Sequence, residues 1–419
     1  MMNLFLVVTF FIGYLTIAFE HKVNISKTAA ALLMSILCWS LLFMKGFPND
    51  EVMIMYLGAH LSEISEVMIF LLGAMTIVEL INAHGGFNII LNLIKTHHKV
   101  LLLWIISFIT FFTSSVLDNL TTAIVIVSLV RRILPDQNER LVFASMIIIA
   151  ANAGGAWTPI GDVTTTMLWM GKRVTAGGLV YHLFIPSLIS MAVPLIYFSL
   201  ILKKEGAAQP AVLNPENVPA AYGAKRILFL GIGALIFVPI LKALTNLPPY
   251  MGIILGLSVV WIFTDLIHQK QHYLKVPHIL TKIDISSILF FLGILLSIAA
   301  LETAGILKAL SFWMEQHLHN YDLIAAVMGI ISAIIDNVPL TAAMMGMYNL
   351  SLHPIDSKLW EMTAYCVGTG GSILIIGSAA GVVVMGMEKI KFTWYLKKIS
   401  LPALAGYLAG VIALLVIYR

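Results

Sequence analysis

The stretch SSVLDNLTTA, residues 114–123, decides how this chain folds, because it places an acid in the middle of long apolar sequence. A second copy of the pattern, SAIIDNVPLTA, occupies residues 332–342. A carboxylate near the centre of a bilayer costs roughly 2.5–3.5 kcal/mol on insertion scales, so an acid that a membrane protein keeps there indicates function. The two Asp-Asn pairs therefore predict a duplicated membrane fold with an ion pathway at its centre.

The composition around these pairs is that of a membrane protein. Of the 419 residues, 60% are hydrophobic and 11% are charged, whereas soluble domains are about a quarter charged. Many apolar stretches are long enough to cross the bilayer as helix, which takes roughly 20 residues, and they lack the alternation of barrel strands. We therefore expect an all-α polytopic membrane protein whose partner is the lipid bilayer. No basic, aromatic-interleaved face suggests a nucleic-acid partner.

The chain divides into two similar halves. FLLG at residues 70–73 matches FFLG at 290–293, AGG at 153–155 matches TGG at 369–371, and IGD at 160–162 matches IGS at 376–378. The spacing between paired positions stays between 216 and 220 residues. We therefore predict a first repeat at residues 1–202, a Pro- and Ala-rich cytoplasmic linker at 203–226, and a second repeat at 227–419.

Loop charges predict that the two repeats are inverted. If residues 100–130 form a re-entrant hairpin, the basic segments 95–99 and 131–140 lie on one side of the membrane. Threading the remaining helices brings most other basic loops to that side, which the positive-inside rule makes cytoplasmic. The N-terminus is then extracytoplasmic. A single broken crossing over residues 100–130 would separate the two basic loops, so we reject it.

Four helix breaks at membrane depth are candidate ion sites. Two are hairpin tips, at residues 118–119 and 336–339, and two interrupt crossing helices, at 152–162 and 368–378. Backbone carbonyls freed by such breaks can coordinate a cation where they line a cavity. No Lys or Arg falls at any of the four breaks, so an anionic substrate would lack a counter-charge there.

Oxygen ligands at these breaks suit a hard cation, and the first repeat has more of them. Thr121 and Thr122 follow Asp118 by three and four residues, which would place them on its helix face. The second repeat carries Ser378 where the first carries Asp162. The candidate ion-binding residues are Asp118, Asn119, Thr121, Thr122, Asn152, Thr158, Asp162, Asp336, Asn337, Thr369, Ser372 and Ser378.

Each candidate also has a purely structural interpretation. Asp118, Asp162 and Asp336 can cap the helices that follow them. Thr and Ser near helix breaks often hydrogen-bond only to backbone carbonyls. Glu79 and Glu302 follow the matching FLLG and FFLG motifs, near predicted helix ends, and are weaker candidates for a proton relay.

Five blocks of the chain resemble the NhaD-type sodium/proton antiporters of the ion transporter superfamily, which also contains arsenite permeases. The resemblance implies a scaffold and a mobile transport unit with two hairpins, an elevator-like movement, and a homodimer in a bacterial inner membrane. Dicarboxylate carriers of the superfamily have Ser-Asn-Thr at their hairpin tips, whereas Asp stands at the tips here, which favours a cation. The blocks are FLLGAMTIVELINAHGGF (70–87), SSVLDNLTTAIV (114–125), ANAGGAWTPIGDVTTTMLW (151–169), SAIIDNVPLTAAM (332–344) and GTGGSILIIGSAAGVVVMG (368–386).

We therefore expect a secondary transporter that exchanges Na⁺, and also Li⁺, for H⁺ by alternating access and serves pH homeostasis. Asp118, with Asp162 nearby, would hold Na⁺ at one stage of the cycle and protons at another. We expect no cofactor and no enzymatic activity. One alternative is a carrier of arsenite or organic anions. The other is an intramembrane aspartyl protease with Asp118 and Asp336 as its dyad, although the chain lacks the Gly-x-Gly-Asp pattern of such enzymes.

Overall fold

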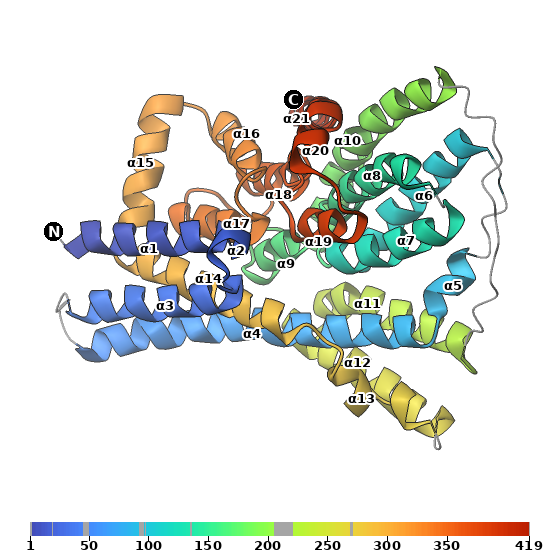
Figure 1. Ribbon diagram of the computed structural model, residues 1–419. Coiled ribbons are helices and arrows are strands. Elements are labelled where there is room, and N and C mark those ends of the chain that lie inside the picture. The colour runs from blue at the N-terminus through green and yellow to red at the C-terminus, as the bar shows by residue number, and fades with distance from the viewer. Residues whose placement is uncertain are drawn as a thin grey trace.

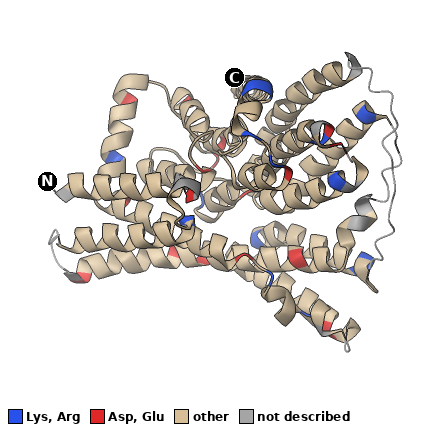
Figure 2. Ribbon diagram, in the orientation of Figure 1, with Lys and Arg blue, Asp and Glu red and all other residues tan. Residues whose placement is uncertain are grey.

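The computed structural model describes residues 2–18, 20–44, 50–91, 96, 98–134, 136–204, 221–268 and 271–418, so most of the predicted linker lies outside the described residues. The regular structure of these ranges is helical, and seven of their helices are long and apolar enough to cross a membrane. In Figure 2 most of the ribbon along these helices is tan, and few positions carry the colours of Lys, Arg, Asp or Glu. The chain is an integral membrane protein built from α-helices, which confirms the predicted fold class.

One bundle is built from long helices of both halves of the sequence. They are α1 (Met2–Ala18), α3 (Lys27–Met44), α4 (Asp50–Ala83), α11 (Ala224–Thr245), α12 (Pro249–Ile267) and α14 (Ile285–Thr303), with α2 (Glu20–Val23), α5 (Gly86–Leu91), η1 (His272–Leu274) and α13 (Val276–Leu280) at their ends. Helix α3 packs between α1 and α14, and α4 packs against α11, α12 and α14. Figure 1 shows α4 running along the whole bundle.

The second bundle contains the predicted helix breaks. Its helices are α6 (Lys99–Ser114), α7 (Asn119–Ile133), α8 (Gln137–Gly155), α9 (Val163–Met170), α10 (Ala176–Lys204), α16 (Tyr321–Ile331), α17 (Asn337–Met347), α18 (Lys358–Gly370), α19 (Ala379–Glu388), α20 (Phe392–Lys398) and α21 (Ser400–Ile417). Helix α15 (Ile306–Leu318) leads into it from α14 (Figure 1). The bundles meet where α14 packs on α17 and α4 on α9.

The helices break close to the expected positions. Helix α6 ends before the first Asp-Asn pair and α7 begins at Asn119, while α16 and α17 flank the second pair in the same way. The other two breaks start later than expected, because Asn152 is still inside α8 and Gly368 is still inside α18. The Gly-Gly pairs that end these two helices allow another helix to approach closely.

Glycine contacts recur in the two halves. A Cβ on Gly154 would lie 2.2 Å from the Phe111 carbonyl oxygen, and a Cβ on Gly370 would lie 1.9 Å from the Gly329 carbonyl oxygen. Both distances are far below van der Waals contact, so only glycine fits at either position. Each glycine thus brings the broken helix of its half directly against the first arm of the matching predicted hairpin.

A serine contact recurs in the same way. The Ser114 hydroxyl donates to the Ala151 carbonyl at 2.6 Å, and the Ser332 hydroxyl donates to the Val367 carbonyl at 2.8 Å. These equivalent contacts support the duplication read from the sequence. The inverted orientation of the two repeats stays a prediction.

Candidate functional site

Three acids at helix N-termini line one cavity. Asp118 is the N-cap of α7, Asp162 of α9 and Asp336 of α17, and each side chain accepts a backbone N–H of its own helix. A helix N-terminus carries partial positive charge and favours an anionic side chain. The cavity between them has a volume of about 70 Å³, and α4 and α14 contribute many of the apolar residues that line it. The capping interpretation is therefore correct, and the acids nonetheless face a shared space.

The two threonines after Asp118 lie in different surroundings. Thr121 donates to the Asp118 carboxylate through its backbone N–H at 2.8 Å and through its hydroxyl at 2.6 Å. The Thr122 side chain is fully buried, and among the described residues its hydroxyl has no hydrogen-bond partner. Thr121 therefore orients Asp118. The Thr122 hydroxyl, four residues after Asp118 in the sequence, makes no hydrogen bond to the described residues.

Asp162 is joined to the first hairpin by an amide network. The Asn119 amide donates to the Asp162 carboxylate and to the Asn152 side-chain oxygen, both at 3.0 Å. The Asn152 amide in turn donates to the Ser378 hydroxyl at 3.1 Å. Thr164 completes the cap of α9 with a backbone N–H 3.1 Å from Asp162. This network connects the two halves of the sequence across the centre of the second bundle.

The second Asp-Asn pair has poorer surroundings. Asp336 accepts one backbone N–H, from Val338, at 3.3 Å. The Asn337 side-chain oxygen accepts the Ser332 hydroxyl at 2.8 Å. Where Asp162 caps α9 in the first half, the neutral Ser378 caps α19 in the second. The predicted asymmetry between the halves is thus present in the geometry.

None of the candidate Thr and Ser residues lines this cavity, and three of them donate their hydroxyls to backbone carbonyls. Thr158 donates to the Ser115 carbonyl at 2.6 Å, and so connects the first broken helix to the first hairpin. Thr369 donates to Tyr365 at 2.6 Å, and Ser372 donates to Thr369 at 2.7 Å. These three hydroxyls therefore fit the structural interpretation, in which Thr and Ser near a helix break hydrogen-bond to backbone carbonyls.

Neither predicted relay acid lines the cavity of the three aspartates. Glu79, on α4, accepts the Asn82 amide at 3.2 Å. Glu302, at the end of α14, borders a separate cavity of about 400 Å³ together with Glu63 and Arg173. That second cavity lies between the bundles along the Asp50 half of α4, whereas the aspartate cavity lies along its Ala83 half.

Lys27, which no sequence motif singles out as a site residue, lines the aspartate cavity from the first turn of α3. Its ammonium nitrogen lies 5.0 Å from the centroid of the Phe290 ring, and its charge acts on the Asp336 carboxylate. Lys27 is far from every helix break in the sequence, and we counted it among the loop charges that orient the chain. The only available signal was its position at the start of a predicted helix.

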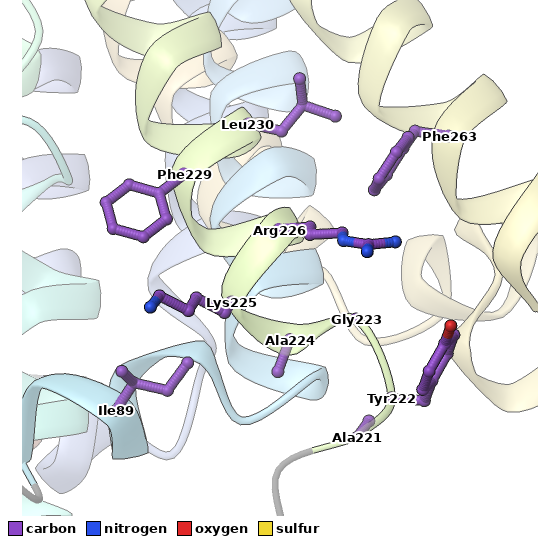
Figure 3. A pocket seen from close by; sticks show the side chains of 10 residues that line it. All are labelled: Ile89, Ala221, Tyr222, Gly223, Ala224, Lys225, Arg226, Phe229, Leu230 and Phe263. Carbon is purple, nitrogen blue, oxygen red and sulfur yellow. The ribbon is translucent and has the colours of Figure 1, made fainter.

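A larger cavity, of about 870 Å³, surrounds the N-terminal end of α11. Figure 3 shows that Lys225 and Arg226 project from opposite sides of this helix, with Arg226 toward Phe263 and Lys225 toward Ile89. The two cations therefore do not converge on one ligand. Of these three cavities in the described part of the chain, the aspartate cavity is the one lined by predicted ion-binding residues, which are Asp118, Asn119, Asp162, Asp336 and Asn337.

Comparison with known proteins gives related transporters. A family model described as "Citrate transporter" matches residues 14–360. Sodium/proton antiporter 1 of Arabidopsis thaliana is 49% identical over 417 residues, which cover 98% of this chain and 72% of that protein. Sodium/proton antiporter 2 of the same plant is 48% identical over 420 residues, or 98% of each chain.

Bacterial proteins match over a similar length at lower identity. The Na(+)/H(+) antiporter NhaD of Halomonas elongata is 29% identical over 453 residues, which cover 99% of this chain and 88% of that protein. The helix breaks and the aspartate cavity thus lie within a chain that is similar to these transporters from end to end.

Proposed function

We propose that this chain, which belongs to the citrate transporter family of membrane proteins, is a cation exchanger. Within that family we infer exchange of Na⁺, and of Li⁺, for H⁺. The names of the plant and bacterial relatives, which are sodium/proton antiporters, support this choice over citrate. The observation that carries the proposal is the cavity lined by Asp118, Asp162 and Asp336.

The chemistry of exchange follows from carboxylates that serve either ion. A carboxylate must lose its proton before it binds Na⁺, so Na⁺ and H⁺ compete for the same oxygens. We assign Na⁺ to Asp118 and Asp162, since the Asn119 amide connects the first Asp-Asn pair to Asp162. Asn119, which lines the cavity beside these two acids, and the carbonyls freed at the breaks would supply neutral oxygens for the remaining coordination positions.

The size and charge of the cavity favour a small cation over an organic anion. Pockets for organic ligands usually measure about 300–1,000 Å³, whereas this cavity measures about 70 Å³. Its lining includes three carboxylates and one ammonium, that of Lys27, so an anion would meet net repulsion. The organic-anion alternative is therefore disfavoured, and the transport assay below tests arsenite.

The protease alternative is rejected. The chain belongs to a family of transporters, and Asp118 and Asp336 are each hydrogen-bonded to the helix that they cap. An aspartyl dyad needs two carboxyls that share a proton, and no hydrogen bond joins these two acids in the described part of the chain.

We infer that the aspartate cavity opens toward the cytoplasm. Lys27 and Ser287, which line it, lie in the first turns of α3 and α14, next to loops whose basic residues predict a cytoplasmic location. Alternating access would then close this cavity and connect the acids to the opposite side. The predicted homodimer, the elevator movement and the bacterial inner membrane stay predictions.

A cation series on the purified protein tests this proposal. In liposomes loaded with a pH-sensitive dye, NaCl and LiCl are expected to drive proton movement in the direction opposite to the cation. The same concentration of choline chloride is expected to drive none and serves as the control for ionic strength. Adding KCl determines whether the site discriminates by ion size.

One result in the same assay would contradict the proposed cation exchange. Uptake of citrate or arsenite into the same liposomes, without proton movement after addition of Na⁺ or Li⁺, would replace the cation exchanger with an anion carrier. Protein-free liposomes and liposomes with the Asp118→Asn variant give the background for both measurements.

A further inference from the structure

Lys27 and Asp336 face the same cavity from different bundles. Lys27 lies in the first turn of α3, which packs against α1 and α14, whereas Asp336 caps α17 in the bundle of helix breaks. The Lys27 side chain is half-buried, and its ammonium rests over the ring of Phe290. Any interaction between the two charges therefore crosses the interface at which the bundles would move in transport.

A partly buried lysine of the second half has different surroundings from Lys27. Lys242, in the last turn of α11, donates to the Trp169 carbonyl at 3.1 Å and lies 4.4 Å from the Trp169 ring centroid. It does not line the aspartate cavity. The lysine of the first half thus faces the acid of the second half, whose own break has a serine in place of a second acid.

The charges around Lys27 decide what it can do. Asp118, Asp162 and Asp336 line the same cavity, Glu20 on α2 accepts the Lys27 backbone N–H at 3.0 Å, and Tyr14 on α1 lies near Asp336. No hydrogen bond or ion pair of the Lys27 ammonium is found among the described residues, so the group is held by the field of the acids and by the Phe290 ring. An ammonium at this distance from a ring centroid is attracted electrostatically to the aromatic face.

We propose that Lys27 is a resident counter-cation of Asp336 and sets the affinity of the cavity for the transported cation. With all acids ionised, Lys27 reduces the net charge of the cavity from −3 to −2. The ammonium thereby leaves Asp118 and Asp162 as the exchangeable pair and weakens Na⁺ binding enough for release. This inference rests on the proposed function, because it concerns the same site and the same ion.

Neutralising Lys27 tests the proposal. Lys27→Gln is expected to lower the KM for Na⁺ in the liposome assay by about tenfold or more, because unit charges a few ångströms apart interact strongly in a partly buried site. Isothermal titration of the purified variant with Na⁺ is expected to give the same tightening without transport. Lys27→Arg keeps the charge and is expected to keep the wild-type KM. Lys282→Gln removes an exposed charge next to α14 and serves as the matched control.

A double variant separates charge from packing. Asp336→Asn alone leaves a net charge of −1 and is expected to raise the KM for Na⁺, whereas Asp336→Asn combined with Lys27→Gln restores −2 and is expected to bring the KM back near wild type. A lysine that only packs on Phe290 would give no such compensation. If Lys27→Gln does not insert into membranes, Lys27→Met, which keeps the apolar stem, takes its place.

Two outcomes would overturn the inference while leaving the exchanger intact. One is an unchanged KM and unchanged Na⁺ titration in Lys27→Gln. The other is an equal shift in Lys282→Gln, which would indicate a general surface-charge effect. Absence of Na⁺-driven proton flux in the wild type would instead refute the proposed function itself, so the two failures are distinguishable.

Discussion

Replacing Asp118 by asparagine is expected to abolish Na⁺-driven proton flux, to below about one per cent of the wild-type rate, while the protein still inserts and purifies. The side chain keeps its shape and one oxygen, so it can still cap α7 by accepting the Thr121 backbone N–H. It loses the charge that attracts Na⁺ and the group that carries a proton. The variant thus separates the cap from the exchange function.

The loss of proton flux in Asp118→Asn follows from the removal of one negative charge next to the bound Na⁺. Asp118 and Asp162 are the two acids that the first half contributes to the cavity, and only Asp162 would remain to neutralise Na⁺ there. Each unit charge within about 4 Å of the ion contributes on the order of 4 kcal/mol at an effective dielectric constant of 20. Losing one such contribution is enough to empty the site at millimolar Na⁺.

The measurement is dye-reported proton flux in liposomes, with protein content matched by gel and thermal unfolding compared with wild type. Asp336→Asn is the matched variant, since it also removes an acid that caps a helix at the same cavity. It is expected to retain exchange at a higher KM. Wild-type flux in Asp118→Asn would reduce the residue to a helix cap, and complete loss in Asp336→Asn alone would move the site to the second half.

Local sequence was enough to find the breaks and the acids. The cost of an intramembrane carboxylate singled out Asp118 and Asp336, and the repeat then led to Asp162 through the matching IGD and IGS motifs. The structure places all three at one cavity. It also distinguishes Thr121 from Thr122, which helical spacing alone had treated alike, because capping geometry turns only Thr121 toward Asp118.

Contacts between distant segments could not be predicted from the sequence. Lys27 reaches the cavity because α3 packs beside α14, and no local pattern records that packing. Glu302 and Glu79 follow matching motifs, yet Glu302 borders the second cavity and not the aspartate cavity. Helix α14 starts near the aspartate cavity and ends at the second cavity, at the opposite end of the interface between the bundles. Arg131 and Arg140 resembled ordinary loop charges, although an acid more than 240 residues later pairs with both.

That acid is Glu388, at the end of α19, and its replacement by glutamine is expected to destabilise the protein by about 3 kcal/mol. Its side chain is 1% exposed, and its two oxygens accept Arg131 at 2.6 Å and Arg140 at 3.1 Å. Its backbone carbonyl accepts the Gln137 amide at 3.2 Å. Removing one partner of a buried ion pair leaves the others desolvated and uncompensated, which costs about 3–5 kcal/mol. We take the lower end because Arg131 is 44% exposed.

The position of Glu388 makes this prediction specific to the bundle of helix breaks. Arg131 lies in α7 and Arg140 in α8, so the acid of the second half holds together the base of the first hairpin and the helix that follows it. Thermal unfolding in detergent, followed by loss of the monodisperse peak, measures the effect. Asp322→Asn is the matched control, because its pair with Lys358 is 27% and 33% exposed and is expected to contribute less than about 1 kcal/mol. Equal unfolding temperatures for the two variants would mean that the Glu388 charges are solvated and that packing alone holds the hairpin.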